Sequence, residues 1–242
     1  MKGNLRGFVD FGIKPTTTYA AAGYDFYIPN LVTEEQKKKA FESFKVSYNK
    51  TEEELIDIYN RIALYLEAIS GANTEALAEN FTNILMLYLS LEAQSINKFR
   101  DLDNKIDEFV TRYLVFDEQK NVPGIKVQLH DHVKINSGVK VALDPETAGI
   151  FYNKSGMGTR GWDTRACVVD EDYSGYVHLS ASYTKDHETG GTIYCGDKFS
   201  QMVVEVIVRG DEFEELDEEK YNEIMKDSKR GANAMGSSDV KH

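Results

Sequence analysis

The spacing of hydrophobic residues changes twice along this chain, and that change limits the folds it can adopt. The first 30 residues and the second half of the chain alternate apolar and polar positions, which is typical of strands with one buried face. Between them, from Thr33 to about Val115, apolar residues recur every three or four positions, as on one face of a helix. The pattern predicts a β domain formed by residues 1–30 and 118–242, with a helical insertion over residues 31–117.

Two capping boxes mark helix starts inside the insertion. Thr33 is followed three residues later by Gln36, and Thr51 by Glu54, so each pair can satisfy free N–H groups at a helix start. The residues that follow the second box place an apolar stripe on one helix face: Leu55, Ile58, Tyr59, Ile62, Leu66 and Ile69. A further run, residues 74–113, contains no Gly or Pro and predicts either a long hairpin arm or two helices. We expect about three helices, with the stripe buried by self-packing or by a protein partner.

Composition excludes several classes of protein. The chain carries 40 acidic and 28 basic residues, a net charge of -12, which argues against a general nucleic-acid binder but not against a small anionic ligand. Its apolar runs are shorter than the roughly 18–20 residues of a membrane span, and the N-terminus does not resemble a signal peptide. The two cysteines, Cys167 and Cys195, suit reduced thiols. These features predict a cytoplasmic protein, in the host cytoplasm if a phage encodes it.

Three of the strand-rich segments end in residues suited to phosphate chemistry. Residues 153–158 place Lys154, Ser155 and two glycines after a strand, where small residues let backbone N–H groups approach an anion. Residues 168–177 deliver Asp170 at a strand end, where a carboxylate can act as a general base. Gln201, inside an apolar strand, must find partners for its amide or bind a ligand. Taken one at a time, each segment also fits an ordinary turn, strand or loop.

Taken in order, five segments resemble the motifs of the trimeric dUTPase superfamily. Residues 20–29, AAAGYDFYIP, are similar to the first motif, and residues 135–158, which end in NKSGMG, to the second. Residues 166–177, ACVVDEDYSGYV, closely match the third motif, which is usually Val/Ile-Asp-x-Asp-Tyr-x-Gly-x-Val. Residues 196–206 and 230–239 resemble the fourth and the Gly-Ser-rich fifth. The resemblance implies a dUTPase-like β-clip or jelly-roll barrel, mainly β, interrupted by an inserted α-helical subdomain.

The resemblance also implies an activity, a metal and an assembly. The activity is hydrolysis of dUTP, or a related pyrimidine deoxynucleoside triphosphate, to the monophosphate and pyrophosphate. Asp170 would activate the attacking water, and Asp25 would lie near a Mg²⁺ ion held mainly by phosphate and water. The implied substrate-binding residues are Lys154, Ser155, Gly156, Thr164, Tyr173, Gln201, Arg230, Met235, Gly236, Ser237 and Ser238. Because motifs of this family come from different subunits, a homotrimer with shared sites follows.

Three departures from the family pattern put base specificity in doubt. Lys154 stands where the family usually has Arg. A compact ammonium therefore replaces a guanidinium group that can donate two parallel hydrogen bonds to a phosphate. Met235 stands where an aromatic residue usually covers the base. The segment between the second and third motifs looks short and has no Asn to read the uracil edge, and Thr164 lies nearest the expected Asn. An altered base reader would suit a phage enzyme that acts on a modified pyrimidine.

Two other functions stay open at this point. One is a dCTP deaminase of the same superfamily, although Lys154–Thr159 lacks the Arg-Ser-Ser-x-Ala-Arg segment usual in those enzymes. The other is a regulatory or binding protein that keeps the dUTPase fold and acts through its helical insertion. Release of pyrophosphate from dUTP would indicate the hydrolase, and release of ammonia from dCTP would indicate the deaminase. Neither product would be expected from a regulatory or binding protein.

Overall fold

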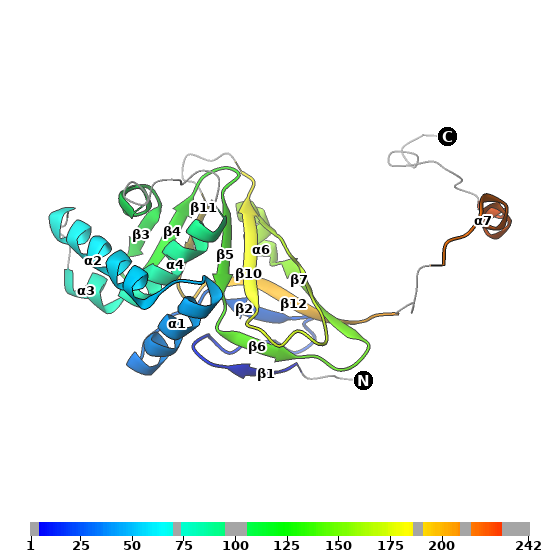
Figure 1. Ribbon diagram of the computed structural model, residues 1–242, viewed down its shortest axis with the longest axis horizontal. Helices are drawn as coiled ribbons and strands as arrows, with labels where there is room; N and C mark the ends of the chain where they lie inside the picture. The colour runs from blue at the N-terminus through cyan, green and yellow to red at the C-terminus, as the bar shows by residue number, and fades with distance from the viewer. Residues whose placement is uncertain (1–4, 70–73, 95–105, 186–190, 209–213, 229–242) are drawn as a thin grey trace. The chain divides into compact units, whose positions relative to one another are not determined.

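The chain forms two compact units, and the first contains almost all of its strands and helices. The computed structural model describes residues 5–69, 74–94, 106–185, 191–208 and 214–228 (Figure 1). The first unit is Met1–Ile207 and the second is Val208–His242. In the first unit, helices lie beside a body of antiparallel strands (Figure 1). The expected β fold with added helices is confirmed.

Four antiparallel sheets make up the β body. The strands are β1 (Arg6–Val9), β2 (Tyr24–Tyr27), β3 (Leu114–Asp117), β4 (Val122–Val127), β5 (His132–Asn136), β6 (Val139–Ala142), β7 (Thr147–Asn153), β8 (Trp162–Thr164), β9 (Val168–Val169), β10 (His178–Tyr183), β11 (Gly191–Tyr194) and β12 (Lys198–Val206). Their orders are β2-β12-β7-β9, β5-β10-β8, β11-β4-β3 and β1-β6. Each of the four sheets therefore joins strands that are far apart in the sequence.

The predicted turn between β5 and β6 forms for a reason visible in the sequence. Gly138 has a positive φ of 67°, and a Cβ there would lie 2.3 Å from the backbone nitrogen of Gly12. The side chain of Asn136 accepts a hydrogen bond from the backbone N–H of Gly138 at 3.0 Å. Only glycine combines this conformation with so close an approach of another chain segment.

The helices between β2 and β3 begin where the capping boxes predict. They are α1 (Glu34–Ser47), α2 (Glu52–Ile69), α3 (Thr74–Glu79) and α4 (Phe81–Gln94). The backbone N–H groups of Gln36 and Glu54 donate to the hydroxyls of Thr33 and Thr51, both at 3.1 Å. The long apolar run is broken at Asn80, whose side chain donates to the backbone of Ala76 at 2.9 Å. Among the described residues before residue 95 there are four helices, rather than about three.

The helical prediction is wrong at its C-terminal end. Residues 109–113 form a short π-helix, and Leu114–Asp117 are strand β3, which pairs with β4. Because β4 has a free edge beside it, Leu114, Val115 and Phe116 are drawn into the sheet despite the helical spacing that precedes them. The prediction for residues 95–105 lies outside the described residues.

Helix α4 belongs to the same hydrophobic core as the strands. Residues 83–91 of this helix are all buried, and the helix packs against β5 and α1. Asn83 accepts a hydrogen bond from the backbone N–H of Leu31 at 2.8 Å, which fixes the chain where it leaves the β body. On α2 the buried residues Leu55, Ile58 and Ile62 confirm that much of the apolar stripe packs within the chain. The inserted helices therefore complete the core.

Two short helices form outside the predicted helical insertion. Helix α6 (Ser155–Arg160) occupies the glycine-containing segment after Lys154, and α7 (Glu218–Met225), in the second unit, has Asp217 as its N-cap. Both cysteines are free, as expected. Within the part of the chain that the structure describes, no helix is long and apolar enough to cross a membrane.

Candidate functional site

The first group of predicted site residues gathers around Asp25 on β2. Asp25 is opposite Gln201 of β12, and its two carboxylate oxygens form separate ion pairs with Lys154 and Lys198, the second at 3.0 Å. The side chain of Asp25 is 17% exposed. Residues from the first, second and fourth motifs thus meet in one chain.

The two lysines keep Asp25 ionised. Burial raises the pKa of Asp25, but the hydrogen bonds and positive charges of Lys154 and Lys198 outweigh it, so the pKa lies below its ordinary value. Lys198 was not singled out in the sequence. Its position three residues before Gln201 on β12 is the only signal that could have pointed to it.

Helix α6 continues this group beyond Lys154. Lys154 is the N-cap of α6, and Ser155 and Gly156, both exposed, form the first turn. The side chain of Lys154 does not cap the helix, because it reaches Asp25 instead. A Cβ at Gly156 would meet nothing within 4 Å, so open space surrounds that backbone. The turn can therefore present N–H groups to an anion.

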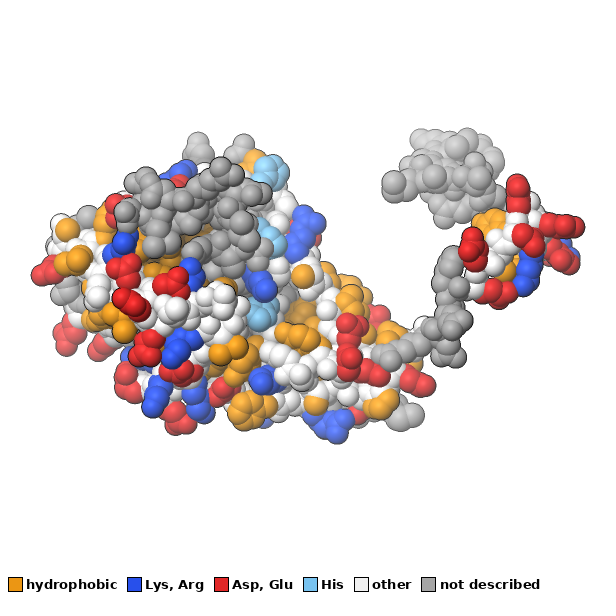
Figure 2. All heavy atoms as spheres, viewed as in Figure 1, with side chains coloured by type: hydrophobic (Ala, Val, Ile, Leu, Met, Phe, Trp, Pro, Cys, Tyr) orange, Lys and Arg blue, Asp and Glu red, His pale blue; other side chains and the backbone are white. Residues whose placement is uncertain are grey.

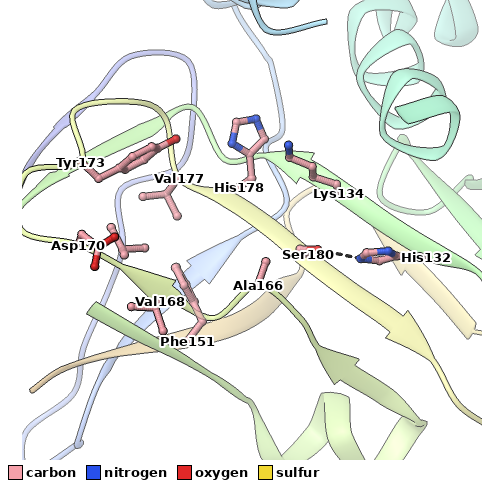
Figure 3. Close-up of a pocket in the computed structure, with 11 residues that line it drawn as sticks. His132, Lys134, Phe151, Ala166, Val168, Asp170, Tyr173, Val177, His178 and Ser180 are labelled. Carbon is pink, nitrogen blue, oxygen red and sulfur yellow. Dashed lines mark hydrogen bonds between the residues drawn. The ribbon is translucent and has the colours of Figure 1, made fainter. Parts of the chain in front are cut away.

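The second group surrounds a cavity of about 360 Å³ beside Asp170 (Figure 3). Asp170 directly follows β9 and is exposed. Tyr173 is 42% exposed, and its hydroxyl donates to the backbone carbonyl of Tyr176 at 2.8 Å. The residues that line the cavity are His132, Lys134, Phe151, Ala166, Val168, Val169, Asp170, Tyr173, Val177, His178 and Ser180. The third motif thus opens on a cavity with an acid and an aromatic ring at one end.

Sequence reasoning missed four polar residues of this cavity. His132 and Lys134 on β5, and His178 and Ser180 on β10, alternate with buried Val133, Ile135, Leu179 and Ala181. The period of two places the four polar side chains on one face of the sheet. That alternation was readable in the sequence, but only the pairing of β5 with β10 shows that they share a wall.

The helical insertion reaches this region through α1. A second hollow, of about 760 Å³, is lined on one side by α1 and on the other by the third-motif loop, and it shares Tyr173 and His178 with the first cavity. Asp10 connects the two sides. It accepts a hydrogen bond from the hydroxyl of Tyr176 at 2.7 Å and forms an ion pair with Lys39 of α1 at 3.2 Å.

The two groups of site residues are separate within one chain. In the sheet order β2-β12-β7-β9, three strand steps lie between Asp25 on β2 and the end of β9, where Asp170 follows. At about 4.8 Å per step, the backbones of these residues are at least about 14 Å apart. Within one chain, Asp25 and Asp170 therefore cannot both contact the same attacking water, since reacting atoms lie roughly 3–3.5 Å apart.

In the segment expected to read the base, Ala166 and Val168 line the cavity beside Asp170, and Thr164 does not. The backbone N–H and hydroxyl of Thr164 both donate to the Asn153 side chain, at 2.7 and 2.6 Å, and Thr164 does not line the cavity beside Asp170. Trp162 is 2% exposed and packs against Tyr183 and Phe199 in the core. The role expected for Thr164 stays a prediction. The side chains of Ala166 and Val168 supply the cavity wall instead.

The residues of the fifth motif lie outside the described residues. They are Arg230, Met235, Gly236, Ser237 and Ser238, and their expected contacts stay predictions.

The burial of His178 predicts a pH-dependent stability. Burial and the nearby charge of Lys134 lower the pKa of His178 from 6.5 to about 4. Above pH 6.5 the imidazole is neutral in both folded and unfolded states; between pH 6.5 and 4 the unfolded chain binds a proton that the folded chain does not. Stability is therefore lost as pH falls through this window, by about 1–2 kcal/mol at pH ~5. Urea unfolding of wild type and His178→Gln at pH ~7.5 and ~5 should show a smaller loss in the variant; equal losses would contradict this.

Comparison with known proteins finds one family model and several solved structures that are similar to parts of the chain. Residues 123–239 match the family model of dUTPase, and no curated protein matches the chain. Among solved structures, native EIAV dUTPase is 20% identical with a TM-score of 0.33, covering 45% of this chain and 92% of its own. A mutant dUTPase from phage phi11 of S. aureus, described with a structural Mg(II) ion, is 17% identical with a TM-score of 0.34, over 39% and 78%. A mutant dUTPase from phage 80alpha is 10% identical with a TM-score of 0.49, over 98% and 99%.

The matched residues contain the second to fifth motifs, the residues that line the cavity beside Asp170, and Lys154 of the group around Asp25. The part of the chain that is similar to the dUTPase family is therefore residues 123–239, just under half of its length.

Proposed function

We propose that this chain hydrolyses dUTP to dUMP and pyrophosphate, with Asp170 as the general base. The observation that carries the proposal is the cavity that holds Asp170 and Tyr173 together inside the family-matched segment. Asp170 would accept a proton from water as the water oxygen bonds to the α-phosphorus. The bond from that phosphorus to the bridging oxygen breaks, and pyrophosphate leaves. Production of dUMP and pyrophosphate from dUTP tests the proposal, and its absence overturns it.

The cavity beside Asp170 suits the nucleoside part of the substrate. Its volume of about 360 Å³ falls within the range of small-molecule sites. Tyr173 presents a ring to one end, where it can pack against the deoxyribose and disfavour a 2′-hydroxyl. Phe151, Ala166 and Val168 give the cavity an apolar side on which a flat base can lie.

The group around Asp25 suits the triphosphate. Lys154, Gln201 and the first turn of α6, with Ser155 and Gly156, offer a cation, an amide and backbone N–H groups to phosphate oxygens. Arg230, Ser237 and Ser238 are expected to close over the γ-phosphate, and Met235 and Gly236 over the base.

The residues near Asp25 fit a magnesium ion that is held mainly by the substrate. Within the described residues, no three acidic, histidine or cysteine side chains cluster as a metal site. Both oxygens of Asp25 are engaged by lysines, so the carboxylate suits contact with the ion through a water molecule. When bound, Mg²⁺ would neutralise phosphate charge and fix the conformation of the triphosphate.

The separation of the two groups supports a site shared between copies of the chain. Asp170 and Asp25 lie at opposite edges of one sheet, at least about 14 Å apart. A second copy that places its Asp25 group next to Asp170 brings general base and phosphate-binding residues together. This arrangement is the homotrimer that the family resemblance implies, with closed rotational symmetry giving three equivalent sites.

Mixing two inactive variants should restore activity if sites are shared. The Asp170→Asn and Lys154→Met variants are refolded together in equal amounts. A shared site is then intact only when the Lys154→Met chain supplies Asp170 and the Asp170→Asn chain supplies Lys154. Random assembly makes roughly one quarter of sites intact. We therefore expect about a quarter of wild-type pyrophosphate release, against near-background activity for each variant refolded alone.

The control is the double variant, Asp170→Asn with Lys154→Met in one chain, refolded with Asp170→Asn. No site in that mixture can contain Asp170, so its activity should stay at background. Activity from the complementary mixture no higher than from this control would show that both groups act within one chain.

A further inference from the structure

The polar face of the β5–β10 pair forms the inner wall of the nucleoside cavity. Ser180 is opposite Lys134 in the register, and His178 is opposite Asn136, so Lys134 and His178 are diagonal neighbours. Such neighbours lie about 7–8 Å apart at the backbone, within reach of a long side chain. Figure 3 shows the amine of Lys134 and the imidazole of His178 beside each other, on the Tyr173 side of the cavity. In Figure 2, histidine side chains also reach the surface of the β body.

His178 offers a hydrogen-bond acceptor at this wall. Burial and the charge of Lys134 lower the pKa of His178 and so favour the neutral imidazole. A neutral imidazole carries N–H on one ring nitrogen and a lone pair on the other. That nitrogen can accept a hydrogen bond from a ligand.

Lys134 offers a donor next to that acceptor. Its ammonium carries three N–H groups, and Lys134 lines the cavity. Because Lys134 is half-buried beside the cavity, a carbonyl oxygen in the cavity would give it a partner. The wall thus presents a donor and an acceptor side by side.

The edge of a uracil ring is the complement of this pair. Uracil places a carbonyl oxygen, O4, next to N3–H, an acceptor beside a donor. Cytosine places an amino group, N4, next to an unprotonated N3, a donor beside an acceptor. With cytosine, the lone pair of His178 would face the lone pair of N3, and the ammonium of Lys134 would face an amino group. A site built on such paired hydrogen bonds discriminates sharply.

We propose that His178 and Lys134 read the base, and that together they select uracil-type pyrimidines over cytosine. The proposal rests on the proposed function, because it takes the cavity beside Asp170 and Tyr173 as the nucleoside site. The segment before Asp170 has no Asn that could read the base. The proposal assigns that role to side chains from two strands of the β body, β5 and β10.

Equilibrium binding tests this inference without relying on hydrolysis. The full-length protein is titrated, with Mg²⁺, with α,β-imido-dUTP and α,β-imido-dCTP, and the ratio of the two Kd values is measured by calorimetry. Wild type should prefer the uracil analogue. His178→Phe keeps a ring but removes both nitrogens, and Lys134→Met keeps the stem but removes the charge. Each should reduce the preference at least about tenfold, mainly by weakening binding of the uracil analogue. A general structural defect would weaken both analogues equally and leave the ratio unchanged.

Lys126→Met is the matched control for Lys134→Met. Lys126 is also a half-buried lysine on a strand, β4, but it does not line the cavity. The uracil preference should survive this change within about twofold. The inference is overturned if His178→Phe keeps the wild-type ratio, if Lys126→Met shifts it as much as Lys134→Met, or if wild type binds both analogues equally or neither. A wild type that prefers the uracil analogue through His178 but does not hydrolyse dUTP would overturn the proposed function alone.

Discussion

Replacement of Asp170 by Asn should lower the rate of pyrophosphate release from dUTP by about 10³-fold, within the 10²–10⁴-fold range of general-base catalysis. Asn keeps the size of the side chain but cannot take a proton from water. Because Asp170 is exposed at the end of β9 and packs into no core, the fold should be unaffected. The measurement is kcat at saturating dUTP with Mg²⁺, together with the Kd of α,β-imido-dUTP, which we expect to change by less than about fivefold.

Asp172→Asn is the matched control, since it removes the same charge from the same loop. Asp172 is also exposed, but it does not line the cavity that Asp170 borders. Its removal should change kcat by less than about threefold, as expected for a surface carboxylate outside the reacting geometry. If Asp172→Asn is the more damaging change, the assignment of the general base is wrong.

Deletion of residues 33–115, with a short linker in their place, should leave a chain that does not fold. Residues 83–91 of α4 are buried, and the helix packs against β5. The deletion would expose the buried residues of β4 and β5 that share this core and would remove β3 from β4. The loss of apolar burial far exceeds the 5–15 kcal/mol that stabilises a typical domain. Circular dichroism and urea unfolding should show no cooperative transition.

Two leucines of the insertion give a quantitative control for this prediction. Leu87 on α4 is 0% exposed, and Leu64 on α2 is 65% exposed. Leu87→Ala should reduce the free energy of unfolding by about 2–5 kcal/mol, as for large-to-small changes in a core. Leu64→Ala should change it by no more than about 0.5 kcal/mol. A deleted protein that unfolds cooperatively would instead show that the helices form a dispensable subdomain.

The sequence predicts local structure best where backbone chemistry alone decides it. The capping boxes at Thr33 and Thr51 start helices because a hydroxyl and a polar side chain three residues later satisfy the same N–H groups in any tertiary setting. The turn at Gly138 follows from a conformation that glycine adopts most easily. Helix α6, which follows Lys154, was not predicted, because its two glycines have low helix propensity.

The dUTPase resemblance was likewise contained in the sequence, because short ordered motifs survive when most other residues change. Asp170 and Tyr173 lie three residues apart and share a cavity, as that spacing implies. What the motifs could not supply is which of them meet within one chain. Asp25, Lys154 and Gln201 come together, while Asp170 lies at the other edge of the same sheet.

The sequence by itself therefore determined which groups are available to this protein: an acid at a strand end, a lysine followed by small residues, and a helical insertion in a β fold. Only the tertiary structure decided that α4 is part of the core and that His178 and Lys134 share the wall of the cavity beside Asp170. The physical reason is that capping and turn formation act over a few residues, whereas burial and strand pairing join residues far apart in the chain. The alternation of polar residues on β5 and β10 has no functional meaning until the pairing of those strands places them on one wall.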